Sequence, residues 1–141
     1  MSVYAVIDTN VLVSALLSQH DDAATVQVIQ RIIMGQVIPV YSNVIMSEYR
    51  AVLNRRKFAF SENAIELLLS FFEKFGVLSL PEHLDIQLPD MKDLPFYEIV
   101  MDKREENAFL VTGNLKHFPR KSFIVTAREF LSILNSKLGQ D

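Results

Sequence analysis

Two segments place polar side chains directly after predicted buried strands. Asp8 follows the apolar run Val3–Ile7, and Gly113-Asn114 follow Ala108–Val111. Short apolar runs without alternation are typical of strands buried on both faces of a parallel sheet. Ligands of such sheets bind beyond the carboxyl ends of the strands, so both segments are candidates for a functional edge. Asp is also a frequent helix N-cap, and for Asp8 alone the cap and the site are equally good interpretations.

A second acidic residue, Glu48, lies on the apolar side of a predicted helix. It shares a helical face with Ile45, Tyr49 and Val52, which should point toward the sheet. An ionised carboxylate there is strongly unfavourable unless it pairs with a positive charge or binds a cation. The alternatives are exposure at the margin of the face, or a salt bridge to one of three basic residues: Arg31, Arg50 or Arg55.

A third acid, Asp93, stands just before Leu94-Pro95, and proline is well suited to the first turn of a helix. Asp93 therefore lies at the inner edge of that helix's apolar face, although an N-cap is again the alternative. The neighbouring Asp90 is expected to face solvent. Three carboxylates from separate segments repel one another when brought together, which a hard divalent cation or raised pKa values would resolve.

The available residue types favour Mg²⁺ or Mn²⁺ as that cation, because both prefer oxygen ligands. The chain has no cysteine, and its three histidines are scattered, which argues against a zinc site. Asp8, Glu48 and Asp93 are the predicted metal ligands. Such a site commonly activates water and stabilises charge during attack on a phosphodiester.

Strands and helices alternate along the chain. The predicted strands are Val3–Ile7, Val37–Tyr41, Val77–Leu80, Ala108–Val111 and Phe123–Val125. The predicted helices are Val11–Leu17, Ala23–Met34, one capped by Ser42 or Asn43, Glu62–Phe75, Leu94–Asp102, and one opened by the capping box Thr126-x-x-Glu129. This order predicts an α/β fold, a three-layer α/β/α sandwich with a mainly parallel central sheet. No repeat or linker interrupts it, so residues 1–141 are expected to form a single domain.

The composition narrows the class of protein. Of 141 residues, 50% are hydrophobic, which excludes disorder. No apolar run reaches the ~20 residues that a membrane span requires. The lack of cysteine excludes thiol catalysis and a disulfide scaffold. The N-terminus has no features of a signal peptide, so a cytoplasmic location without membrane association is expected.

The formal net charge of −3 would by itself argue against a nucleic-acid partner. The charge is uneven, however, because residues 82–106 hold eight acidic and three basic residues. Seven of the 14 basic residues lie in two short segments that follow predicted site residues. Arg55 and Lys116 are the leading candidates for contacts to RNA phosphates. Tyr49 and Phe118 are candidates for base stacking. Ordinary solvated surface is the alternative for each.

Four segments, in order, resemble the motifs of PIN-domain proteins. They are Ala5-Val-Ile-Asp-Thr-Asn-Val-Leu-Val-Ser-Ala15, Ser47-Glu-Tyr-x-x-Val-Leu53, Asp90-Met-Lys-Asp-Leu-Pro-Phe96 and Leu110-Val-Thr-Gly-Asn-Leu-Lys-His-Phe-Pro119. The overlap extends from near the N-terminus to about Val125. No single motif is specific, but the ordered set is. It most resembles the VapC-like branch, the toxin components of toxin–antitoxin pairs.

The resemblance implies a metal-dependent endoribonuclease that forms a homodimer and binds a cognate antitoxin. Asp8, Glu48 and Asp93 match the family's three acidic metal-site positions, and Asn114 stands where many members have a fourth acid. Asparagine keeps an oxygen that can ligate a cation or hold a water molecule, but it has no charge and cannot act as a base. Its presence fits a single metal, weaker metal affinity or a degenerate enzyme.

Small polar residues also match the family pattern. Thr9 and Asn10 stand beside the first acid, and Thr112 directly precedes the glycine of the fourth motif. The resemblance implies that they orient Asp8 or touch the phosphate of the substrate.

Helix Glu62–Phe75 is apolar over much of its circumference, which is typical of burial in the core or in an interface with the antitoxin or a second subunit.

Three other functions stay open. A hydrolase of the haloacid-dehalogenase group would use Asp8 as a nucleophile, but it normally has a second Asp where Asn10 stands. A receiver-like signalling module would need a phosphoacceptor Asp on a middle strand, and Val37–Tyr41 ends without one. The leading alternative is a catalytically degenerate PIN module that binds RNA or protein without cleavage, because Asn114 replaces an acid.

Overall fold

The fold is built on a parallel sheet, seen here in a computed structural model that describes residues 2–137. Within that range the sheet has five strands in the order β3-β2-β1-β4-β5, and every neighbouring pair is parallel. The strands are β1 (Val3–Ile7), β2 (Val37–Tyr41), β3 (Val77–Leu78), β4 (Phe109–Val111) and β5 (Ile124–Val125). The central strand β1 is almost completely buried, as its uninterrupted apolar sequence predicts.

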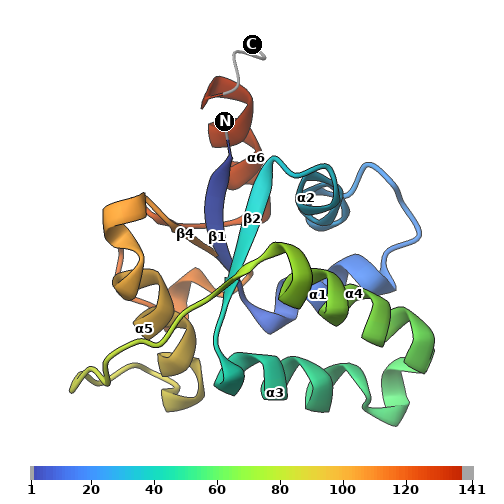
Figure 1. The fold of residues 1–141 in the computed structure, drawn as a ribbon, viewed down its shortest axis with the longest axis horizontal. Coiled ribbons are helices and arrows are strands. Elements are labelled where there is room, and N and C mark those ends of the chain that lie inside the picture. Colours follow the sequence, from blue (N-terminus) through green and yellow to red (C-terminus); the bar gives the residue numbers. More distant parts are fainter. Residues whose placement is uncertain (1, 138–141) are drawn as a thin grey trace.

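Helices cover both faces of the sheet. They are α1 (Thr9–Leu17), α2 (Ala24–Ile33), α3 (Asn43–Leu53), α4 (Glu62–Phe75), α5 (Leu94–Asp102) and α6 (Ala127–Lys137). Figure 1 shows α5 on one side of β1 and β4, with α1, α2 and α4 on the other side. The predicted three-layer α/β/α sandwich is therefore confirmed.

The predicted element boundaries agree closely with the structure. The predicted bounds Val3–Ile7, Val37–Tyr41 and Glu62–Phe75 match the structure, and the helix that begins at Leu94 ends at Asp102. The first helix begins at Thr9 rather than Val11, and the three remaining strands are each shorter by one or two residues. The 3-10 turns are missing from the prediction, because such short turns have no apolar periodicity: Arg56–Phe58, Met91–Asp93, Arg104–Glu106 and Leu115–His117.

Side-chain caps explain where three of the helices begin. The Ser42 hydroxyl, not Asn43, accepts the hydrogen bond that caps α3, and Ser61 caps α4 in the same way. At α6, Thr126 and Glu129 each accept from the other's backbone N–H, at 3.2 and 2.8 Å. The predicted capping box is thus confirmed.

The core joins α3, α4 and α5 through one aromatic cluster. The buried Tyr49 ring meets Phe72 edge-on, with 5.9 Å between centroids, and lies 6.2 Å from the Phe96 ring. Its hydroxyl donates to the carbonyl oxygen of Ile7 at the end of β1. A buried phenol needs such an acceptor, so this bond fixes α3 relative to the sheet.

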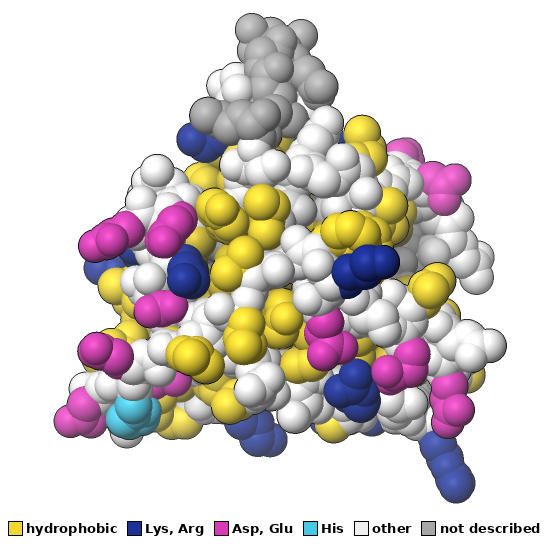
Figure 2. Space-filling view, viewed as in Figure 1, with side chains coloured by type: hydrophobic (Ala, Val, Ile, Leu, Met, Phe, Trp, Pro, Cys, Tyr) yellow, Lys and Arg dark blue, Asp and Glu magenta, His cyan; other side chains and the backbone are white. Residues whose placement is uncertain are grey.

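The acidic residues of the segment 82–106 gather on one part of the surface. Figure 2 shows acidic side chains gathered on the left, over α5 and the segment that precedes it. Two acids of residues 82–106 tie the segment between β3 and α5 to that helix: Glu98 accepts from the backbone N–H of Leu84, and Asp102 from the Ser79 hydroxyl. Part of the negative charge therefore serves the loop's structure. Among the described residues, no helix is long and apolar enough to cross a membrane.

Gly76 ends α4 where two backbone segments meet. A Cβ atom at this position would lie 2.4 Å from the carbonyl oxygens of both Phe72 and Pro39. Because neither oxygen belongs to a flexible side chain, a larger residue forces the end of α4 away from β2.

We expect Gly76→Ala to lower the free energy of unfolding by about 1–3 kcal/mol, the usual effect of overpacking. Urea unfolding followed by circular dichroism measures it. Gly35→Asn is the matched control, since Gly35 has open space around it and a φ of +82° that asparagine tolerates. Equal stability of Gly76→Ala and wild type would contradict the clash.

Candidate active site

The candidate site lies at the topological switch point of the sheet, where the order of strand addition reverses at β1. From β1 the chain crosses to β2 on one side, whereas β4 enters on the other side of β1. Ile7 and Val111 are register partners, so the residues that follow them leave the sheet at the same edge. A ligand crevice forms at this kind of switch point in parallel sheets. Asp8 and Thr112 are the first residues beyond the two strands.

Asp8 is buried at this edge, with 4% of its surface exposed. It occupies the N-cap position of α1, but its carboxylate makes no cap hydrogen bond. Instead Oδ2 accepts from the Thr112 hydroxyl at 2.8 Å and from the Asn10 side-chain amide at 3.2 Å. Asp8 is therefore the N-cap residue of α1 by position, but its carboxylate bonds to Thr112 and Asn10 rather than to the backbone of the helix.

The pKa of Asp8 is raised from 3.8 to about 6, and burial is the largest cause. The negative charges of Asp93 and Glu48 contribute to the rise, while the hydrogen bond from Thr112 opposes it. Both of these acids thus lie near enough to Asp8 to influence its ionisation.

Glu48 is half-buried and is held by a residue of α1. The Thr9 hydroxyl donates to Glu48 Oε2 at 2.5 Å. The salt-bridge alternative is not realised among residues 2–137, where Arg50 pairs with Glu66 and Arg31 bonds to Gln36 and Asn135. The carboxylate faces the site rather than a basic partner.

Asp93 stands at the N-cap position of α5, again without a side-chain cap hydrogen bond. Its Oδ2 lies 2.9 Å from Nδ1 of His117. Burial raises the pKa of Asp93, and the hydrogen bond and charge of His117 oppose that rise. The exposed Asp90 is the residue that caps locally, accepting from the backbone N–H of Lys92.

His117 is a site residue that sequence reasoning did not assign. It lies in the fourth motif, four positions after the glycine, and the motif assigns it no role. The 3-10 turn Leu115–His117 swings its ring toward Asp93. A turn of three residues carries no sequence signal that would give this direction.

The loop after β4 is tied to the first turn of α1. Asn10 Oδ1 accepts from the backbone N–H of Gly113 at 3.0 Å, and Thr112 Oγ1 accepts from that of Asn114 at 3.0 Å. Asn114 itself is exposed and joins this network through its backbone. A Cβ atom on Gly113 would lie 3.2 Å from Asn10 Oδ1, so the close approach favours glycine.

The predicted substrate contacts are only partly compatible with the structure. Arg55 and Lys116 are exposed and available for phosphate. The prediction that bases stack on Tyr49 or Phe118 is wrong, because both rings are buried in the core. The neighbouring residues in the sequence do not indicate the direction of either ring. Helix α3 directs the Tyr49 ring inward, and the Leu115–His117 turn directs the Phe118 ring inward.

The donor chemistry at this edge fits a hard divalent cation. Asp8, Glu48 and Asp93 offer carboxylate oxygens, and a cation would relieve the repulsion that contributes to the raised pKa of Asp8. As arranged here, however, no three His, Cys, Asp or Glu side chains of residues 2–137 lie close enough to hold an ion together. Binding therefore requires the carboxylates to converge or to act through water.

The raised pKa of Asp8 predicts how stability depends on pH in metal-free, EDTA-treated buffer. The folded state binds the proton more tightly than the unfolded state, so the free energy of unfolding falls as pH rises from about 4 to about 6. Asparagine does not ionise, so Asp8→Asn removes this fall in the free energy of unfolding. The substitution should raise the free energy of unfolding at pH 7 by on the order of 2 kcal/mol. Urea titrations at pH 4 and 7 measure it. The exposed control Asp21→Asn should show no such pH-dependent gain, and an equal gain in both variants would contradict the origin at Asp8.

Comparison with known proteins identifies a family for this chain. The family model of the PIN domain matches residues 4–116, a range that includes Asp8, Glu48, Asp93 and Asn114. Neither the curated proteins nor the solved structures contain a match. PIN domains are generally nucleases, which are hydrolases. With most of its length matched, the chain belongs to the PIN domain family.

Proposed function

We propose that this protein is an endoribonuclease that hydrolyses RNA phosphodiester bonds with Mg²⁺ or Mn²⁺. The observation that carries the proposal is the buried Asp8 carboxylate, whose pKa is raised in part by Glu48 and Asp93. Mutual repulsion of acids at a ligand-binding edge is unfavourable for the fold alone and is useful to a site that binds a cation. Membership of a family of nucleases supports the same activity.

Asp8, Glu48 and Asp93 would hold the cation, with Asn114 as a neutral oxygen donor or water ligand. A divalent cation, when bound, neutralises charge on the phosphate and makes bound water more acidic. The pKa of about 6 keeps most Asp8 side chains ionised at neutral pH, which is the form that ligates.

The surrounding side chains orient these acids. Thr112 and Asn10 both donate to Asp8 Oδ2, so Oδ1 takes neither of these two bonds. Thr9 holds Glu48, and His117 holds Asp93. Such outer contacts fix ligand geometry, and their loss commonly weakens metal binding.

A non-cleaving PIN module is the second candidate. It is favoured by the neutral Asn114 and by the lack of a closed three-residue ligand group in residues 2–137. This candidate predicts metal or RNA binding without hydrolysis, and gain of activity in Asn114→Asp.

We further propose the role of toxin in a cytoplasmic toxin–antitoxin pair, acting as a homodimer. Support comes from the VapC-like order of the four motifs and from apolar side chains that stay exposed. On α4, Ile65, Leu69 and Phe72 enter the core, whereas Leu67 and Phe75 are 77% and 55% exposed. One face of α4 thus packs in the core, and its exposed apolar side chains are free to form an interface with another protein.

The activity is tested by incubating a mixed RNA pool with Mg²⁺ or Mn²⁺. We expect cleavage by wild type, abolition by EDTA, and loss of roughly 100-fold or more in Asp8→Asn, because a neutral amide replaces an ionised ligand. Asp21→Asn is the control and should cleave like wild type. Equal cleavage by Asp8→Asn would refute the assignment of Asp8.

Lys116 is expected to add a phosphate contact beside the site. Lys116→Glu should weaken RNA binding and reduce the slope of log affinity against log salt by about one. Fluorescence anisotropy at several salt concentrations measures both quantities. Lys137→Glu makes the same charge change at the end of α6, and an equal effect there would show that only net charge matters.

A further inference from the structure

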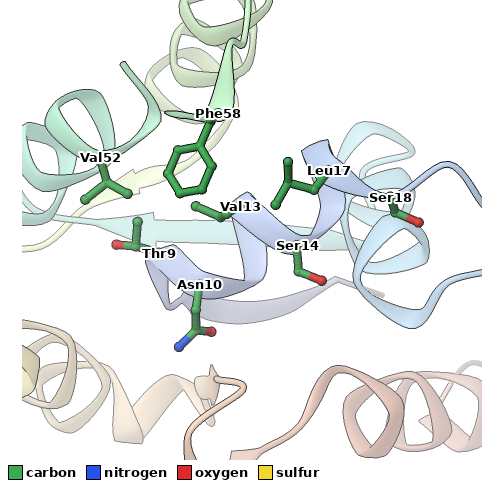
Figure 3. A pocket seen from close by; sticks show the side chains of 8 residues that line it. All are labelled: Thr9, Asn10, Val13, Ser14, Leu17, Ser18, Val52 and Phe58. Atoms are coloured by element: carbon green, nitrogen blue, oxygen red, sulfur yellow. The ribbon is translucent and has the colours of Figure 1, made fainter. Parts of the chain in front are cut away.

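A groove leads away from the candidate site along α1. Thr9 and Asn10, which touch Glu48 and Asp8, line its inner end, and it continues along α1 as far as Ser18. Val52 and Phe58 form the opposite wall. Its volume is about 600 Å³, within the range of small-molecule sites. Figure 3 shows the Phe58 ring projecting toward α1 between Val52 and Leu17.

The Phe58 ring is held in position before any ligand arrives. It stacks on Phe60 with 5.3 Å between centroids and an interplanar angle of 10°. The Lys57 ammonium lies 5.1 Å from the ring centroid. An aromatic ring between aliphatic walls suits a flat group with apolar faces. The hydroxyls of Ser14 and Ser18 also line the groove, where they bond to Thr25 and to the backbone of His20.

The charge around the groove distinguishes a nucleotide from an apolar peptide. Arg55, Arg56 and Lys57 directly precede Phe58, and all three are exposed. Lys57 lies against the Phe58 ring, and Arg55 and Arg56 belong to the same short turn, so positive charge adjoins this wall of the groove. By contrast, the cavity between α1, α2 and α4 is lined by apolar residues and a single polar one, Gln30. The groove at Phe58 therefore complements a polyanion that also carries flat groups.

We propose that this groove is a nucleobase subsite, which holds one base of a single-stranded RNA next to the phosphodiester at the carboxylates. The inference rests on the proposed ribonuclease function and adds its substrate class. A base can enter only when it is unstacked, so single strands are selected over duplexes. Packing against Phe58 recognises any base, because every base has a π-face.

Binding is measured without cleavage, in an Asp8→Asn background with EDTA. The probes are a fluorescein-labelled RNA octamer and eight versions in which one nucleotide in turn is abasic. Phe58→Ala should weaken the intact octamer roughly 5- to 100-fold, the range found when one base loses its aromatic partner. One abasic position should cause a similar loss with Phe58 present and little further loss in Phe58→Ala, because the two changes remove the same contact.

A spectroscopic variant reports the contact directly. The chain has no tryptophan, so Phe58→Trp introduces a single emitter into the groove. Its emission should be quenched by the intact octamer and much less by the version that is abasic at the sensitive position. Phe75→Trp is the matched control on α4, outside the groove, and should not respond. Phe58→Leu keeps an apolar side chain against the rest of the protein but removes the aromatic ring. A loss of affinity in this variant would therefore come from the missing ring and not from misfolding.

The two proposals fail in different ways. Unchanged octamer affinity in Phe58→Ala and Phe58→Leu overturns the subsite and points to a protein partner as the occupant, even if wild type cleaves RNA. Equal losses at all abasic positions in wild type and Phe58→Ala overturn it too. Base-dependent binding at Phe58 without RNA cleavage by wild type supports the subsite and overturns the proposed catalytic activity.

Discussion

Water is kept from the Asp8 carboxylate on nearly every side, and neighbouring groups have to compensate for that loss of hydration. Part of the compensation comes from the Thr112 hydroxyl and the Asn10 amide, and the remainder appears as a pKa well above that of a free Asp. Asn10 also accepts from Gly113, so the residues that satisfy the carboxylate are those that join the β4 loop to α1. The junction of the two strands and the environment of the acid are therefore one hydrogen-bonded unit.

A second constraint comes from Tyr49, because its buried hydroxyl must find an acceptor and takes the carbonyl of the residue just before Asp8. This bond sets the distance from α3 to the end of β1, and the ring's contacts with Phe72 and Phe96 extend the same restraint to α4 and α5. Burial and the charges of Asp8 and Glu48 raise the pKa of Tyr49, so the phenol stays protonated and keeps donating. Glu48, the adjacent residue on α3, is positioned by a core contact rather than by a surface one.

The α/β/α fold could be predicted because buried strands and helix caps each leave a local pattern. Ser42 is one of the two predicted caps of α3, and Asp8 follows β1 at the edge where β4 also ends. What depends on short turns could not be predicted. The turn at Leu115–His117 decides that His117 meets Asp93 while Phe118 is buried, and the turn at Arg56–Phe58 decides that Phe58 faces α1. Both outcomes depend on a few backbone angles that no periodicity encodes.

Every acid of the site is held by a partner from a distant part of the chain. Thr112 lies 104 residues after Asp8, Thr9 lies 39 residues before Glu48, and His117 lies 24 residues after Asp93. Contacts between distant residues form late, because the intervening loop must first be closed. During synthesis all three acids are made before Thr112 and His117, so a nascent or truncated chain has Asp8 without its hydroxyl donor and Asp93 without its imidazole partner. Assembly of the candidate site thus waits until nearly the whole domain has been made.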